Sequence, residues 1–149
     1  MATNEIHSIL VAVDISHDGN AVCAFARNLA RALGAQVTAL YVVEELPEGL
    51  RGLDLPALRP EDDVPGQEQE ALRRLRDHAR ENLGPDAGLY VTAGEPAREI
   101  LRVARERGID LVVMGNHGRK GLAKALYGST VQEVTEAAAV PVLTVPVPG

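Results

Sequence analysis

The segment of this sequence best suited to bind an anion is the glycine-rich run 115–130. Its glycines would let backbone N–H groups approach phosphate oxygens, and a helix beginning near Ser129 would add free N–H groups and a favourable dipole. The run holds three fixed cations, Arg119, Lys120 and Lys124, and no acid. A local excess of positive charge favours a phosphate-bearing ligand. The same composition also fits tight turns with basic residues on a surface, so the spacing must decide.

Known phosphate-binding motifs narrow the chemistry. A P-loop is excluded, because Lys120 is followed by Gly121-Leu122 and no Gly-x4-Gly-Lys-Ser/Thr pattern occurs. The turn 14–19 after the first predicted strand lacks Gly-x-Gly-x-x-Gly, which argues against a dinucleotide site. It also lacks the Ser-Gly-Gly-x-Asp-Ser turn of the ATP pyrophosphatases.

The sequence contains none of the following motifs for metal binding or for acyl transfer. The histidines are scattered without His-Glu-x-x-His spacing, and a single cysteine cannot make a Cys-x-x-Cys pair. No Gly-x-Ser-x-Gly elbow is present. We therefore predict no protein-built metal centre and no catalytic residue. Cys23 lies among the apolar residues Ala21, Val22, Ala24 and Phe25, and a small buried apolar side chain is favoured over a reactive thiol.

Apolar periodicity predicts an alternation of strands and helices that would position this segment. Continuous apolar runs predict buried strands, and three- and four-residue spacing predicts amphipathic helices. The strands are expected at 6–13, 37–43, 89–93, 111–114 and 140–147. The helices are expected at 19–33, 71–83, from Pro96 to Gly108, and from Ser129 to about Ala138.

This alternation predicts an α/β fold, a single-domain, doubly wound, five-stranded parallel sheet of the Rossmann-like type with helices on both faces. We expect the strand order 3-2-1-4-5. Ligands of such sheets bind at the carboxyl ends of the strands, where the winding direction reverses. That point lies between the strand ending at Asp14 and the strand ending at Met114-Gly115. The glycine-rich segment therefore begins at the expected ligand site.

Composition limits the possible partners. The chain of 149 residues has 15 basic and 21 acidic residues, a net charge of −6, which opposes binding to nucleic acid or anionic membrane. Aromatic residues make up only 3%, too few for base-stacking platforms. No signal peptide or apolar stretch of about 18 residues is present, so we expect a cytoplasmic protein of one domain, 1–149.

Most of the negative charge lies in one segment, 44–70, which has nine acidic residues, two arginines and four prolines. We interpret it as an acidic mobile loop, about 44–66. A solvated connection is favoured over a dedicated partner-binding element, which remains the alternative. The rest of the chain is close to neutral, so the net charge says little about the glycine-rich segment.

The spacing of that segment carries a family resemblance. Gly115, Gly118, Gly128 and Ser129 form the pattern Gly-x2-Gly-x9-Gly-Ser. Together with the strand segment 9–16 (ILVAVDIS), Gly94-Glu95-Pro96 and the closing segment 141–145 (PVLTV), it resembles the universal stress protein family. The resemblance spans nearly the whole chain outside the acidic segment. In that family this glycine pattern marks the members that bind ATP.

The resemblance implies a role for each matching residue. Asp14 would accept hydrogen bonds from the ribose hydroxyls, and Val42 would meet adenine through its backbone. The apolar walls of the pocket would be Ala12, Val13 and Met114. The phosphates would be surrounded by Gly115, His117, Gly118, Gly128, Ser129 and Thr130, mostly through backbone N–H groups. His117 is equally well explained as a polar turn residue.

The function expected from the resemblance is an ATP-binding stress-response regulatory module with slow or no hydrolysis. Mg²⁺, if present, would be held mainly by the phosphates. A slow ATPase is the second reading, although only Asp14 supplies a carboxylate near the phosphates. A structural dimer without nucleotide is the third. We also expect a homodimer through the apolar edge strand 140–147, unless its prolines serve to block edge pairing.

Overall fold

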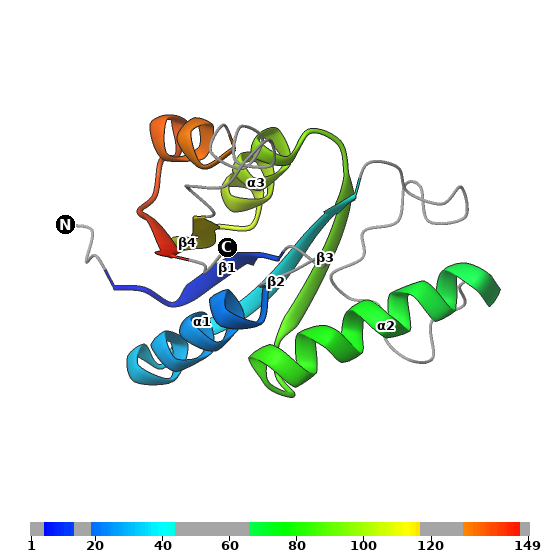
Figure 1. The fold of residues 1–149 in the computed structure, drawn as a ribbon. Helices are drawn as coiled ribbons and strands as arrows, with labels where there is room; N and C mark the ends of the chain where they lie inside the picture. Colours follow the sequence, from blue (N-terminus) through cyan, green and yellow to red (C-terminus); the bar gives the residue numbers. More distant parts are fainter. Residues whose placement is uncertain (1–4, 14–18, 44–65, 117–129, 147–149) are drawn as a thin grey trace.

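The computed structural model describes residues 5–13, 19–43, 66–116 and 130–146. Five strands alternate with helices along the chain, as the apolar periodicity predicts (Figure 1). The strands are β1 (Ser8–Ala12), β2 (Gln36–Val43), β3 (Gly88–Ala93), β4 (Leu111–Asn116) and β5 (Val142–Pro146). The helices are α1 (Gly19–Leu33), α2 (Gly66–Leu83), α3 (Pro96–Glu106) and an unlabelled helix over 130–137.

The strands form one parallel sheet in the order β3-β2-β1-β4-β5, which confirms the predicted fold class and topology. β1 is the central strand, with Ala12 opposite Leu40 on one side and Val11 opposite Val113 on the other. The winding therefore reverses between β1 and β4, where the sequence placed the ligand site.

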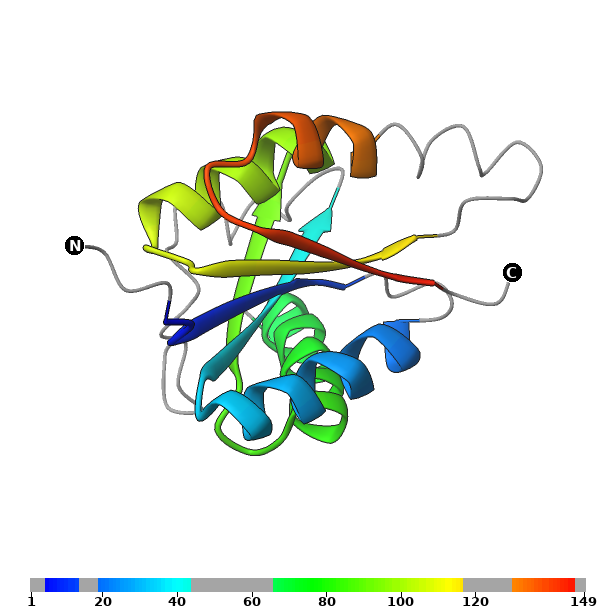
Figure 2. The same cartoon turned by 90° about the vertical axis from the view of Figure 1, so that its left-hand side faces the viewer.

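Helices cover both faces of the sheet, which explains why its strands are apolar on both sides (Figure 2). The face under α1 and α2 carries a buried cluster that includes Val11, Cys23 and Tyr41. The face under α3 and the helix over 130–137 carries a second cluster that includes Leu10, Leu40 and Val134. Cys23 is 1% exposed, and burial raises the pKa of its thiol to about 11, so its predicted apolar role is confirmed.

Glycine ends two helices in the same way at one end of the sheet. Gly34 (φ +66°) follows α1 and Gly108 (φ +61°) follows α3, in the left-handed region that glycine enters without a Cβ penalty. After each glycine the chain turns back, and Ala35 N–H and Ile109 N–H donate to carbonyls five residues earlier. Both stops are those that the sequence predicts.

The start of α2 corrects the sequence analysis. The helix was expected to begin at residue 71, whereas it begins at Gly66, where the acidic mobile loop of about 44–66 was expected to end. The start of this helix has no apolar residue over 66–70 (GQEQE), so apolar spacing gives no sign of it. Glutamate and glutamine are good helix formers, and acids are favoured near a helix N-terminus. Residues 44–65 lie outside the described part of the chain.

Other element bounds differ by one or two residues. β4 runs on from Met114 through Gly115 to Asn116, because these residues continue the pairing with β5. β5 is shorter than the apolar segment 140–147 that predicted it. Within the described residues, no helix is both long and apolar enough to cross a bilayer.

Candidate functional site

The candidate site lies at the carboxyl end of the sheet, where β1 stops earlier than its neighbour β2. Among the described residues, the last hydrogen bond between the two strands joins Val13 N–H to the Leu40 carbonyl at 2.9 Å. β2 continues through Val42 to Val43, still paired with β3. The end of β2 thus projects beyond the described part of β1.

This offset gives Val42 a particular orientation. In a parallel strand the N–H and C=O of one residue point toward the same neighbour, and successive residues alternate. Because the Leu40 carbonyl faces β1, the backbone groups of Val42 face that same side, one step beyond Val13. The N–H donor and the C=O acceptor of this one residue suit a ligand edge that carries one acceptor and one donor, as an edge of adenine does.

An apolar floor lies directly below Val42 on one face of the sheet. Leu40 (fully buried) and Met114 (4% exposed) belong to the cluster beneath α3, and the half-buried Ala12 and Val42 pack against it. Ala12 and Met114 lie on the adjacent central strands at the same level, two residues beyond the paired Leu10 and Val112. The structure therefore brings together three of the predicted pocket residues, Ala12, Val42 and Met114.

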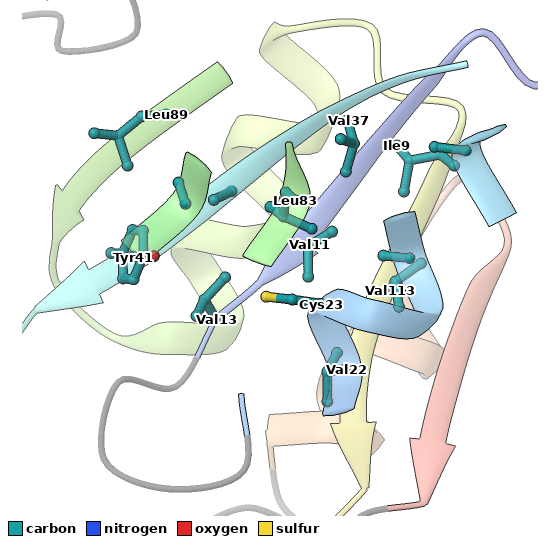
Figure 3. Packing of buried hydrophobic residues seen from close by; sticks show 14 of the residues in the cluster. Ile9, Val11, Val13, Val22, Cys23, Val37, Tyr41, Leu83, Leu89 and Val113 are labelled. Atoms are coloured by element: carbon teal, nitrogen blue, oxygen red, sulfur yellow. The ribbon is translucent and has the colours of Figure 1, made fainter. Parts of the chain in front are cut away.

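Val13 lies on the opposite face. Strand alternation turns its side chain toward α1 and α2, where it packs in the cluster of Tyr41 and Cys23 (Figure 3). It therefore does not share a wall with Ala12 and Met114, contrary to the grouping expected from the resemblance. The reason is the two-residue period of a strand, which sends neighbours to different layers.

Gly115 and Thr130 bracket the segment that was predicted to hold phosphate. Gly115 is the fifth residue of β4 and pairs with Val145. It is absent from the described glycines with positive φ, so it serves as a strand residue rather than a left-handed turn. Thr130 is half-buried at the first described position of the helix over 130–137.

The remaining predicted residues fall outside the described ranges. They are Asp14, His117, Gly118, Gly128 and Ser129. Within the described ranges, no cluster of three or more His, Cys, Asp or Glu side chains could hold a metal ion.

Thr92 is a polar residue beside the site that the sequence analysis did not single out. It pairs with Val42 across β2 and β3, and its hydroxyl Oγ1 is buried without a hydrogen-bond partner in the described part of the chain. A buried hydroxyl without a partner is unfavourable. In sequence, a single threonine in a strand gives no signal that distinguishes it from an ordinary β-former.

The comparison with known families fits this arrangement. A model of the universal stress protein family matches residues 5–146. The chain belongs to the universal stress protein family. The match confirms the family that the sequence resemblance indicates.

Individual relatives align with almost the whole chain. Universal stress protein MJ0531 of Methanocaldococcus jannaschii is 33% identical over 151 residues, which cover 97% of this chain and 85% of the relative. Universal stress protein YxiE of Bacillus subtilis is 30% identical over 145 residues, with 93% and 98% covered.

Solved structures of the family share the fold. UspA of Lactobacillus plantarum is 28% identical with a TM-score of 0.65, covering 95% of this chain and 98% of its own. A universal stress protein in complex with cAMP has a TM-score of 0.65 at 22% identity, over 95% and 97% of the two chains. The Archaeoglobus fulgidus protein in complex with dAMP has a TM-score of 0.61 at 23% identity, over 94% and 98%. At the identities of these last two, the likeness concerns the fold.

Proposed function

We propose that this universal stress protein binds an adenine nucleotide, ATP, at the carboxyl ends of β1, β2 and β4, and acts as a regulatory module. The observation that carries the proposal is the projecting end of β2, where the Val42 backbone faces the β1 side above an apolar floor. Flat apolar surface with two convergent backbone groups suits a purine. Two family members solved with cAMP and dAMP support an adenine ligand.

The phosphates would lie toward the glycine-rich segment. In this proposal Asp14 binds the ribose, and the backbone of Gly118, Gly128 and Ser129 surrounds the phosphates. Thr130, the first described residue of the helix over 130–137, adds a hydroxyl. Mg²⁺ would be held mainly by the phosphates themselves.

The test uses the apolar floor. Ala12→Leu would fill the space above Leu40 and Met114 and should weaken ATP binding in calorimetry by about tenfold or more, a change of about 1.4 kcal/mol. The matched control is Ala32→Leu on the exposed side of α1, which should bind as wild type does. Equal ATP affinity in both variants would refute this location.

Mass spectrometry of nucleotide released from the denatured protein identifies the ligand. Adenine nucleotide in the extract supports the proposal, whereas wild-type protein that neither retains nor binds ATP refutes it. The second reading, a slow ATPase, is distinguished by turnover. We propose hydrolysis well below about 1 per second, the low end for dedicated enzymes, because the groups assigned to the phosphates include no water-activating base.

We also propose a homodimer through the outer edge of β5. Val112 N–H donates to the Pro141 carbonyl, so Pro141 and Leu143 face β4, and alternation turns the backbone of Val142 and Thr144 outward. In the described part of the chain β5 pairs only with β4. An open apolar edge favours antiparallel pairing with a second copy about a two-fold axis.

The backbone direction gives a sharp test of this dimer. Thr144→Pro removes an outward N–H group and leaves the bonds to β4 intact, so light scattering should shift from twice 15.9 kDa toward 15.9 kDa. Thr144→Val keeps the N–H group and should remain dimeric. A monomeric wild type at micromolar concentration would refute the edge pairing.

A further inference from the structure

Among the described side chains, two large apolar ones are exposed, and both belong to α1. They are Phe25, which is 44% exposed, and Leu33, which is 46% exposed. Leu33 is the last residue of the helix, whereas Phe25 lies near its middle. A single exposed apolar side chain is common in soluble proteins, so the surface around Phe25 decides what its exposure means.

Phe25 lies on the flank of α1 that faces away from α2. Cys23 marks the opposite flank, because it is directed toward Val11 and lies near Tyr41, which contacts His78 on α2 (Figure 3). Successive residues of a helix are turned by about 100°, so Phe25 is turned by about 200° from Cys23. The strand order puts β2 and β3, which α2 covers, on one side of α1 and puts β4 and β5 on the other. Phe25 therefore lies on the side of the open β5 edge.

The surface between Phe25 and the β5 edge is apolar. Ala21 and Leu29 lie one turn before and one turn after Phe25 on the same flank, where Ala21 is exposed and Leu29 is half-buried. On β5, which α1 contacts, the half-buried Leu143 packs against the cluster under α1. Its side chain thus lies on the same face of the sheet as α1. We call Ala21, Phe25, Leu29 and Leu143 the α1–β5 surface.

The opposite face of the sheet offers no such surface beside β5. The helix over 130–137 covers that face, and its exposed residues over 132–136 are Gln132, Glu133, Thr135 and Glu136. In the described part of this helix, no large apolar side chain is exposed to a partner. Apolar contact area next to the open edge is therefore found on the α1 face.

The β5 edge is too small to hold a stable dimer by itself. β5 has five residues, so its edge is about 17 Å long and, at a layer thickness of about 10 Å, presents about 170 Å². A stable interface buries about 800 Å² on each partner. The edge pairing therefore needs further contact area, and the α1–β5 surface is apolar area continuous with it.

We propose that the α1–β5 surface is covered by the same surface of a second copy of this chain, with the two Phe25 side chains facing each other across the two-fold axis. The inference rests on the proposed homodimer through the outer edge of β5. A two-fold axis that pairs two identical strand edges in antiparallel fashion stands perpendicular to the sheet. Both copies of α1 therefore lie on one face, on either side of the seam between the two β5 strands.

The distance across the seam suits two large side chains. Neighbouring strands are about 4.8 Å apart, so a helix above β1 and β4, which α1 contacts, lies about 7–10 Å from the seam. The two helices would then be about 14–19 Å apart. Directly packed helices are about 8–10 Å apart, and a phenylalanine from each copy spans the difference. Leu143 of each copy lies below them on the sheet.

The test compares the dissociation constant of the dimer in two matched α1 variants by analytical ultracentrifugation. Phe25→Asp places a charge in the apolar contact from both copies and should raise the constant about 100-fold or more. Leu33→Asp makes the same change at an equally exposed position of the same helix and should leave the constant unchanged. Leu33 precedes Gln36, which is level with Ser8, whereas β5 begins two positions further along the sheet, level with Leu10.

Opposite charges test whether the two Phe25 positions meet. Phe25→Lys alone should also be monomeric, because like charges would face each other across the axis. An equimolar mixture of Phe25→Asp and Phe25→Lys should form heterodimers at concentrations at which neither variant dimerises alone. Because Phe25 is exposed, both variants should keep the fold, which circular dichroism checks.

The outcomes separate this inference from the proposed edge pairing. If the wild type is monomeric, both fail. If Thr144→Pro is monomeric while Phe25→Asp dimerises as the wild type does, the edge pairing stands and the role of α1 is refuted. An equal loss in Leu33→Asp also refutes it, because that result would show a general effect of charge on α1. A mixture without heterodimers refutes it too, because the two Phe25 positions then do not face each other.

Discussion

The two ends of the sheet are built from the same strands, yet the polar groups at the two ends differ in their hydrogen bonds. At the amino end, Asp110 Oδ2 accepts from the backbone N–H groups of His7 (2.9 Å) and Ser8 (3.0 Å) and lies 3.3 Å from Ser8 Oγ. These bonds tie the start of β1 to the start of β4. The His7 backbone bond contributes most to lowering the pKa of Asp110, which favours its charged form.

The carboxyl end lacks such a clamp among the described residues. β2 and β4 extend beyond the described part of β1, Val42 turns its backbone toward the β1 side, and Thr92 Oγ1 is buried without a described partner. At the amino end, the hydrogen bonds of Asp110 hold the two central strands together. At the carboxyl end, the Val42 backbone and the apolar floor are the described groups that we propose for the ligand. Mutations at the two ends should therefore affect different quantities.

The largest effect is expected in the glycine-rich segment at the carboxyl end. Gly118→Val and Gly128→Val each place a branched side chain where backbone is proposed to approach phosphate. Calorimetry should show ATP affinity reduced by about 100-fold or more, equivalent to at least about 2.7 kcal/mol. Wild-type affinity in both folded variants would contradict the proposed phosphate site.

Asp14 should come next. Asp14→Ala removes the proposed ribose acceptor and should cost about 1–3 kcal/mol of binding free energy. Asp86→Ala is the matched control, because Asp86 is exposed in the turn before β3 at the amino end. A control that loses as much affinity as Asp14→Ala would show that net charge, rather than the site, controls binding.

The glycines at the amino end should affect stability alone. An added Cβ at Gly108 or Gly34 meets no atom within 4 Å, so an alanine there causes no clash. It should still lower the free energy of unfolding by about 1–2 kcal/mol, because alanine is unfavourable in the left-handed conformation. Denaturant unfolding should show this loss for each variant, with ATP affinity unchanged. If either substitution lowers affinity, the two ends are not independent.

The smallest effect is expected for Asp110→Asn, which retains one acceptor oxygen. Because the folded-state pKa of Asp110 is lowered, the carboxylate stabilises the fold above its unfolded pKa, about 3.9, and this contribution disappears as the pH falls through the lower folded value. Calorimetry should show the wild type melting higher at pH 7 and the difference vanishing toward pH 2. A difference that persists at pH 2 would show that the carboxylate charge is not its source.

Local sequence signals predicted the elements well where burial created a pattern. The helix stops at Gly34 and Gly108 and the N-terminus of α3 were all readable, since Glu95 accepts from Ala97 and Arg98 N–H as a cap and Pro96 occupies the first turn. The first turn of α2 was missed because it buries nothing apolar. The strand predicted over 111–114 stopped short of the observed β4, because a glycine-rich run conceals that Gly115 and Asn116 still pair with β5.

For this protein, the sequence by itself determined the strand and helix order, the parallel sheet and the family, because apolar periodicity and glycine spacing are properties of neighbouring residues. Tertiary structure decided the contacts that depend on register. It placed Val13 and Ala12 in different layers, set Thr92 beside Val42, and paired Tyr41 with His78, 37 residues later in the chain. Such partners meet only once strands and helices have packed, since no local pattern encodes the distance between them.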